Sequence, residues 1–260
     1  MKDILNLLGG RLRDEAEESR KFRELLDSKI LEWDLQEIKS LIEECLAQSK
    51  DPAYHNAFQD IIVSIGKRLG FDVSYGNYSG KRGVIGVDGI WKTGEYSILL
   101  EVKSSVWPIE SIRQLGNYIS SYEKTEESQK YVYGLYILGK GDPSPLLEQI
   151  RGSDYRSKIR LIKYDDLLEL IKLADKLEPA LEKEEAQTKI RQILLPLESI
   201  NIGNLVHLLL DLTSITPTEE EEAEKEEKEE EVPWPPDDLQ EYLRNCTRYQ
   251  RVLLAALVKA

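Results

Sequence analysis

Residues 83–105 read GVIGVDGIWKTGEYSILLEVKSS, and this stretch decides the fold class. The apolar and β-branched run 84–91 predicts one strand, and the run 96–103 predicts a second. Between them, residues 92–95 (KTGE) have the composition of a tight turn, so the stretch predicts a β-hairpin. We expect the rest of the chain to supply sheet partners and covering helices for this hairpin.

Three charged residues interrupt the apolar hairpin: Asp88, Glu101 and Lys103. Because strand side chains alternate between two faces, Glu101 and Lys103 point to one side, while Leu100 and Val102 point to the other side, into a core. A carboxylate and an ammonium on a buried strand are unfavourable unless they have partners. The hairpin is therefore the first place to look for a chemical site. Two other interpretations stay open: a turn or bulge residue at Asp88, and a Glu101–Lys103 ion pair on a solvated sheet face.

The segment before the hairpin predicts a helix followed by a short strand. Asp51 and Pro52 form a helix-start signal, with the aspartate as the N-cap. The apolar stripe that follows ends at Gly70, a helix-stop signal, so we expect a helix over 53–69. Residues 71–75 (FDVSY) then predict the strand.

Two amphipathic helices are predicted nearer the N-terminus, over 2–27 and 33–48. The densely charged stretch 14–23 fits a solvated helical face. We expect these helices to form either a helical cap on the domain or an arm for docking or dimerisation.

After the hairpin, the sequence alternates between helices and strands, as in an α/β domain. The run 131–138 (YVYGLYIL) is almost continuously apolar, which is typical of a central strand covered on both faces. The other expected elements are a helix over 109–123, a short helix over 145–150, a strand over 159–163, and a helix capped by Asp165 that ends near Leu177.

The last part of the chain has a different composition. Residues 180–212 predict one or two helices broken near Pro196, and 237–260 predict a helix that fits either an amphipathic tail or the first helix of a winged-helix domain. Between them lies a linker with ten glutamates and two lysines in 219–231. We therefore divide the chain into a helical N-terminal extension (1–50), an α/β core (51–178), a helical extension (179–215), an acidic and proline-rich linker (216–236) and a C-terminal helix (237–260).

The composition excludes several classes of protein. Of the 260 residues, 41% are hydrophobic and 32% are charged, and no apolar run reaches the roughly 18 residues of a membrane span. Two cysteines without a CxxC disfavour a disulfide framework, a zinc site and an iron–sulfur cluster, so we expect a cytoplasmic protein. The net charge of −13 disfavours tight non-specific DNA binding, but more than half of it lies in 219–231 and leaves room for a local basic cleft.

Asp88, followed after twelve residues by Glu101-Val102-Lys103, resembles the motif of the PD-(D/E)XK nuclease superfamily. Val87 stands where the family usually has proline. The expected order of helix, three strands, helix and strand is similar to that of the family, and the resemblance covers about 53–175. It implies a restriction-endonuclease-like core, an αβββαβ unit with a mixed sheet flanked by helices, with helical additions at both ends.

Three further segments add to the resemblance. Residues 114–118 (QLGNY) are similar to the QxxxY motif of the RecB-type branch. Residues 86–90 (GVDGI) resemble the VDG segment of Mrr-type restriction enzymes. Gln59 stands where the first helix of Mrr-type enzymes and Holliday-junction resolvases often carries a glutamate ligand. Because an amide is a poorer Mg²⁺ ligand than a carboxylate, Gln59 disfavours a second, tightly held metal.

The resemblance implies a Mg²⁺-dependent DNA endonuclease in which Mn²⁺ substitutes for Mg²⁺. Asp88, Glu101 and the carbonyl of Val102 then supply oxygen ligands, and the metal lowers the pKa of a bound water. Lys103 orients that water or stabilises the extra charge of the transition state. The other implied site residues are the catalytic Gln114, Tyr118 and Gln59 and, for contacts with phosphate, Lys81, Arg82 and Arg113.

Several roles stay open from the sequence alone. The implied setting is defence or DNA processing, with a homodimer if both strands are cut. The alternative is a weak or inactive nuclease-fold module for DNA binding or assembly, with RNA as a further possible substrate. The helical ends or the acidic linker could bind a protein partner, and no membrane partner is expected. His55 is expected to be structural or to contact DNA, and Trp91 and Trp107 to pack in the core or stack on bases.

Overall fold

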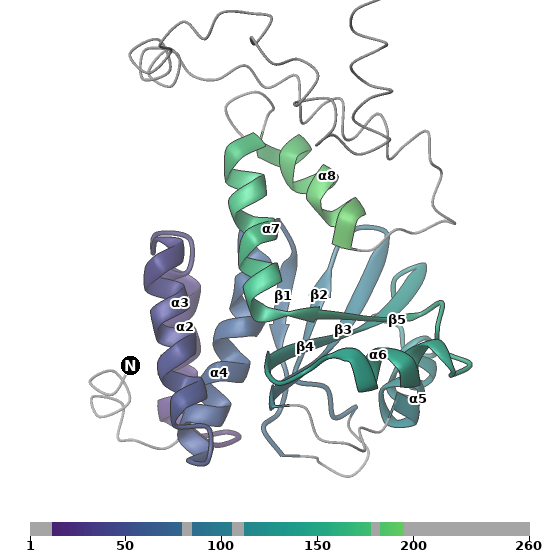
Figure 1. The fold of residues 1–260 in the computed structure, drawn as a ribbon, viewed down its shortest axis with the longest axis horizontal. Coiled ribbons are helices and arrows are strands. Elements are labelled where there is room, and N and C mark those ends of the chain that lie inside the picture. The colour runs from purple at the N-terminus through teal and green to yellow at the C-terminus, as the bar shows by residue number, and fades with distance from the viewer. Residues whose placement is uncertain (1–11, 80–84, 106–111, 178–182, 195–260) are drawn as a thin grey trace, which may run out of the picture. The chain divides into compact units, whose positions relative to one another are not determined.

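A five-stranded mixed sheet forms the centre of the fold (Figure 1). The structure, a computed structural model, describes residues 12–79, 85–105, 112–177 and 183–194. The strands, in sheet order, are β1 Asp72–Tyr75, β2 Gly89–Lys92, β3 Tyr96–Ser105, β4 Tyr131–Lys140 and β5 Ile159–Lys163. The pairs β1–β2 and β2–β3 are antiparallel, whereas β3–β4 and β4–β5 are parallel. The predicted hairpin and the α/β class are confirmed.

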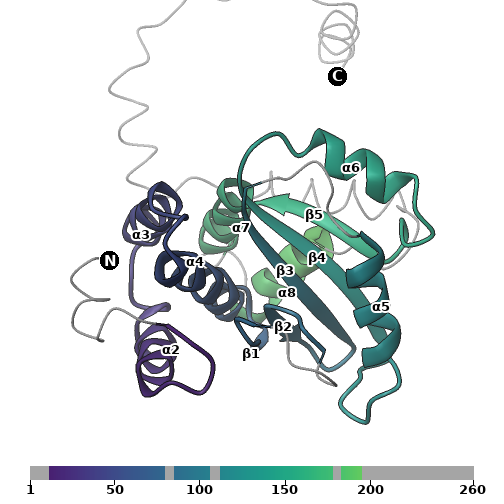
Figure 2. The same cartoon turned by 90° about the horizontal axis from the view of Figure 1, so that it is seen from below.

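Helices cover both faces of this sheet (Figure 2). Helices α4 Pro52–Ile65 and α7 Tyr164–Leu177 pack on one face, and α5 Ile112–Tyr122 and α6 Ser144–Arg151 pack on the other. Helices α2 Glu17–Lys29 and α3 Leu35–Ala47 pack against α4, while α8 Lys183–Leu194 packs against α7 and the 3₁₀ helix η1 Gly66–Leu69. None of the described helices is long and apolar enough to cross a membrane.

Strand β3 is buried on both faces and positions the charged pair predicted from the sequence. Ile98, Leu100 and Val102 are at most 2% exposed. Leu99 points to the opposite side and joins the apolar cluster beneath α5 and α6. Since side chains alternate along a strand, Glu101 follows Leu99 on the face that α5 covers. The predicted alternation of the hairpin is confirmed.

The helical segment that begins with α4 starts and stops as the sequence predicts, but its last turn, from Gly66 to Leu69, is the 3₁₀ helix η1. The Asp51 carboxylate accepts the N–H of Ala53 at 2.9 Å, with Pro52 in the first turn. Gly70 ends η1 with φ +74°, a left-handed conformation that favours glycine. A Cβ on Gly70 would lie 2.3 Å from Oε1 of Gln187 on α8, so the Gln187 side chain would have to move as well.

Two predicted helix boundaries are wrong. The helix predicted over 2–27 does not run through residues 12–16, where Ser19 exchanges two hydrogen bonds with the backbone of Arg13, and α2 begins at Glu17. Asp165 is not the cap of α7 but lies in its first turn, where a carboxylate interacts favourably with the helix dipole. The predictions for 1–11 and for 195–260, which include the linker and the C-terminal helix, lie outside the described residues.

The capping box of α3 gives a first testable prediction. The Asp34 carboxylate accepts the N–H of Glu37 at 2.6 Å, and the Glu37 carboxylate accepts the N–H of Asp34 at 2.9 Å. We expect Asp34→Ala to lower the free energy of unfolding by about 1 kcal/mol, measured by urea denaturation. Asp34→Asn, which keeps a side-chain acceptor, is the control; an equal loss in both variants would show that the cap contributes nothing.

Candidate active site

Glu101 and Lys103 form an ion pair at the end of β3. Their Oε1 and Nζ atoms lie 2.6 Å apart, and the two side chains are 13% and 28% exposed. Both groups are therefore largely withdrawn from water but still reachable from it. The prediction that they share one side of the strand is confirmed.

Asp88 lies at a bend immediately before β2, and the regular strand predicted from residue 84 is wrong at this point. The Asp88 N–H donates to the Leu100 carbonyl at 3.0 Å, although Gly89 is the residue that pairs with Leu100. Two residues thus share one partner, as in a β-bulge, which re-aims the side chain of the extra residue. The Asp88 carboxylate accepts the N–H of Val102 at 2.6 Å, a donor that a regular strand would have paired with a backbone carbonyl.

The environment of Asp88 favours a bound cation. Burial raises the pKa of Asp88 to about 8, and the negative charge of Glu101 adds to the increase, while the Val102 N–H and the charge of Lys103 oppose it. The negative charge of Glu101 therefore opposes ionisation of Asp88, and a positive charge beside the two acids would relieve their repulsion. Lys103 supplies one such charge, and its bond goes to Glu101.

Gln59 and His55 approach the same site from α4. Gln59 is 3% exposed, and its amide donates to the backbone carbonyl of Asp88 at 3.3 Å. His55 lies one turn earlier and is partly buried; its pKa is lowered, first because burial disfavours the charged ring and second because of the charge of Lys103. The structure thus brings Gln59 to Asp88 as a donor to the backbone.

Gln114 and Tyr118 lie on one face of α5, as predicted. The Gln114 amide donates to the Tyr118 hydroxyl at 2.7 Å. A Cβ on Gly86 would lie 3.0 Å from that hydroxyl, so Tyr118 sits over the chain two residues before Asp88. The pair therefore borders the segment that carries Asp88.

The remaining residues named from the sequence lie on α5, in the core or outside the described residues. Arg113 is exposed on α5, and Lys81, Arg82 and Trp107 lie outside the described residues. Trp91 is fully buried and donates from Nε1 to the Val63 carbonyl at 2.7 Å, so it packs in the core. The base-stacking alternative for Trp91 is wrong.

The donor set fits a hard cation with few protein ligands. Asp88 and Glu101 offer two carboxylates, and the carbonyl of Val102 is the third oxygen predicted from the sequence. Among the described residues, no group of three or more His, Cys, Asp or Glu side chains gathers into a site for a metal ion. Mg²⁺ binds through one or two carboxylates and keeps several waters, so two carboxylates suit it better than they suit zinc.

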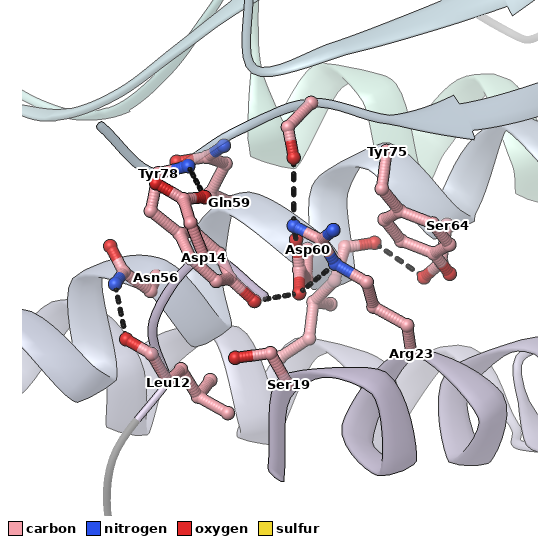
Figure 3. Close-up of polar contacts among 12 residues, drawn as sticks. Leu12, Asp14, Ser19, Arg23, Asn56, Gln59, Asp60, Ser64, Tyr75 and Tyr78 are labelled. Carbon is pink, nitrogen blue, oxygen red and sulfur yellow. Dashed lines mark hydrogen bonds and ion pairs between the residues drawn. The ribbon is translucent and has the colours of Figure 1, made fainter. Parts of the chain in front are cut away.

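A buried ion pair behind this site was missed by sequence reasoning (Figure 3). The Arg23 guanidinium binds the carboxylate of Asp60 through two bonds, of 2.9 and 3.0 Å, and Asp60 is fully buried. The interpretation of 14–23 as a solvated face is therefore wrong for Arg23 and for Ser19, which is also buried. The available signal was Asp60 itself, an acid inside the apolar run of α4.

No protein-family model matches this chain, and no curated protein is significantly similar to it in sequence.

Proposed function

We propose that this protein is a Mg²⁺-dependent DNA endonuclease of the PD-(D/E)XK superfamily, with a restriction-endonuclease-like core. One observation carries the proposal: Asp88, Glu101 and Lys103 gather at the end of the central hairpin, where burial and mutual repulsion of the acids favour a cation. In a domain with no catalytic or metal-binding role, burying these charged groups would only lower the stability.

The arrangement of elements supports the proposal. The order α4, β1, β2, β3, α5, β4 is the αβββαβ order that the sequence resemblance implies. The sheet is antiparallel through β3 and parallel from β3 to β4, with α5 as the crossover. Asp88 directly precedes β2, and Glu101 and Lys103 lie on its antiparallel partner β3, which agrees with a motif shared by two adjacent strands.

Each group has a role in phosphodiester hydrolysis. Asp88, Glu101 and the Val102 carbonyl would hold Mg²⁺, which supplies a Lewis acid and lowers the pKa of water when it is bound. Lys103 donates hydrogen bonds to the scissile phosphate, and its charge offsets the negative charge that develops in the transition state. Glu101 keeps the Lys103 ammonium in place through their 2.6 Å contact. Mn²⁺, which also accepts oxygen ligands, is expected to replace Mg²⁺.

Gln59 differs from the glutamate that the related first helices often carry. Its amide donates to the Asp88 carbonyl, so it orients the Asp88 backbone and is not a ligand in this arrangement. This supports a site with a single metal ion.

The test is nicking of supercoiled plasmid DNA in the presence of Mg²⁺ or Mn²⁺. We expect Lys103→Ala to lower the rate by a factor of about 10²–10³, the usual effect of removing one donor to transition-state charge. Lys172→Ala changes an exposed lysine on α7 and serves as the control. Equal cleavage by wild type and Lys103→Ala, or cleavage by neither, would refute the nuclease proposal.

Tyr118 offers a milder test of the same site. Tyr118→Phe removes the hydroxyl that accepts the Gln114 amide, and we expect the nicking rate to fall by a factor of roughly 2–10, as for the loss of one net hydrogen bond. Tyr131→Phe, at an exposed tyrosine on β4, is the matched control. If both variants nick DNA at the wild-type rate, Tyr118 has no part in the reaction.

The second candidate is a nuclease-fold module that binds DNA or assembles with a partner and does not cleave. The amide of Gln59 favours a module that does not cleave, and the net charge of −13 favours assembly with a partner over DNA binding. It predicts DNA retention without nicking, unchanged by Mg²⁺. Cleavage of single-stranded RNA, tested in place of plasmid DNA, would show whether the substrate is RNA or DNA. Cleavage of both DNA strands at one position would indicate a homodimer.

A further inference from the structure

One guanidinium joins three segments of the chain behind the candidate site (Figure 3). Arg23, from α2, binds both carboxylate oxygens of Asp60, on α4. Its Nη2 also donates to the Gly76 carbonyl, just beyond β1, at 2.9 Å. The Arg23 side chain is 23% exposed and that of Asp60 is fully buried, so these bonds are made largely out of water.

Two tyrosines fix the orientation of this guanidinium. The rings of Tyr75 and Tyr78 lie with their centroids 5.0 and 4.7 Å from the Arg23 Cζ atom. The Tyr78 hydroxyl also donates to Asp60, and the backbone N–H of Tyr78 donates to Asp14 at 2.7 Å. The planar fork of Arg23 is thus held on both sides and at its tip, an arrangement that a lysine ammonium does not reproduce.

Gly76 connects the guanidinium to Asp88. The Gly76 N–H donates to the Asp88 carbonyl at 2.9 Å, the same carbonyl that Gln59 binds. A Cβ on Gly76 would lie 1.9 Å from the Val87 carbonyl oxygen, so the two backbone segments are in direct contact. A displacement of Gly76 therefore moves the backbone of Asp88 with it.

We propose that Arg23 and Asp60 are positioning residues that hold the backbone of Asp88, so that α2 is part of the catalytic unit. The inference rests on the proposed role of Asp88 as a metal ligand. The Asp88 carboxylate meets the Val102 N–H only while its backbone stays at its place in the bulge. Catalytic groups need placement to within about 0.5 Å, and a misplacement of 1 Å lowers rates by a factor of about 10².

A matched control lies one turn along α2. Arg20 forms exposed ion pairs with Glu17 and Glu24 of α2 itself, at 2.9 and 2.7 Å. Arg20→Met therefore removes an arginine charge from the same helix and leaves the bonds from Arg23 through Gly76 to Asp88 in place.

The experiment measures backbone amide hydrogen exchange in the metal-free, full-length protein. Arg23→Lys keeps a positive charge beside Asp60 but loses the fork, and Arg23→Met removes the charge. In both variants we expect the Gly76 and Val102 amides to exchange about tenfold faster relative to the Leu100 amide, which reports any overall loss of stability; tenfold is the effect of one net hydrogen bond. Arg20→Met is expected to leave all three amides at the wild-type rate.

A second readout connects the exchange data to the site. Arg23→Lys is expected to weaken Mn²⁺ binding about tenfold and to lower the maximal nicking rate with little change in the DNA concentration needed for half-maximal rate. Faster exchange at Gly76 with unchanged exchange at Val102 would overturn the positioning role. Exchange is measured without metal or DNA, so it tests the positioning role by itself. A wild-type protein that neither binds Mn²⁺ nor cleaves DNA would count against the proposed function alone.

Discussion

Asp88→Asn is expected to weaken Mn²⁺ binding about a thousandfold. The substitution keeps the size of the side chain and an oxygen that accepts the Val102 N–H, so it removes the charge and little else. A unit charge about 4 Å from another contributes about 4 kcal/mol at the effective dielectric constant of a partly buried site, which corresponds to about three factors of ten in affinity. Nicking of DNA is expected to disappear with the metal.

Mn²⁺ titration followed by calorimetry or by electron paramagnetic resonance measures this effect. Asp142→Asn, at an exposed aspartate beside the start of α6, is the control and should bind as wild type does. Because the substitution at Asp88 removes the repulsion between two acids, we expect the metal-free variant to be at least as stable as wild type. Tight Mn²⁺ binding by Asp88→Asn would place the metal elsewhere in the protein.

Arg23→Ala is expected to cause the largest loss of stability among single changes at charged residues. It leaves the fully buried Asp60 without its partner, and breaking a buried ion pair in this way lowers the free energy of unfolding by about 3–5 kcal/mol. Burial already raises the pKa of Asp60 despite the opposing effects of Arg23 and Tyr78, which shows how strongly this site disfavours an unpaired charge. Urea denaturation measures the loss.

Two further variants separate the ion pair from the helix that carries Arg23. Arg20→Ala, on the same helix, breaks only exposed pairs with Glu17 and Glu24 and is expected to change stability little. The double variant Arg23→Met, Asp60→Leu removes both charges and is expected to recover at least half of the loss. An Arg23→Ala protein as stable as Arg20→Ala would mean that Asp60 takes up a proton or finds another partner at no net cost.

The local parts of the fold follow from the sequence. The hairpin, the N-cap at Asp51, the stop at Gly70 and the central strand β4 each depend on residues close together in the chain, and each prediction is confirmed. A bulge at Asp88 was one of the alternatives that the sequence left open, and local residues could not decide it. It depends on the end of β1, which brings Gly76 to the Asp88 carbonyl, and on the Asp88 carboxylate, which takes a backbone donor of β3.

The candidate site was likewise predictable where it depends on local spacing, and not where it depends on tertiary contacts. The side shared by Glu101 and Lys103 follows from strand alternation, and the pairing of Gln114 with Tyr118 follows from helical spacing. The Arg23–Asp60 pair joins residues 37 positions apart, and a charged stretch on an amphipathic helix gives no local sign that one arginine turns inward. Tertiary packing alone decides which charge of such a stretch is buried.

The measurement that tests the central claim most directly is anomalous diffraction from crystals of the full-length protein soaked in Mn²⁺. We predict one manganese peak with carboxylate oxygens of both Asp88 and Glu101 at roughly 2.1 Å, close to the Mg–O distance, and with Lys103 beside it. A peak bound by only one of these carboxylates, or no peak at Asp88 at saturating Mn²⁺, would contradict a metal-dependent nuclease centre on this hairpin.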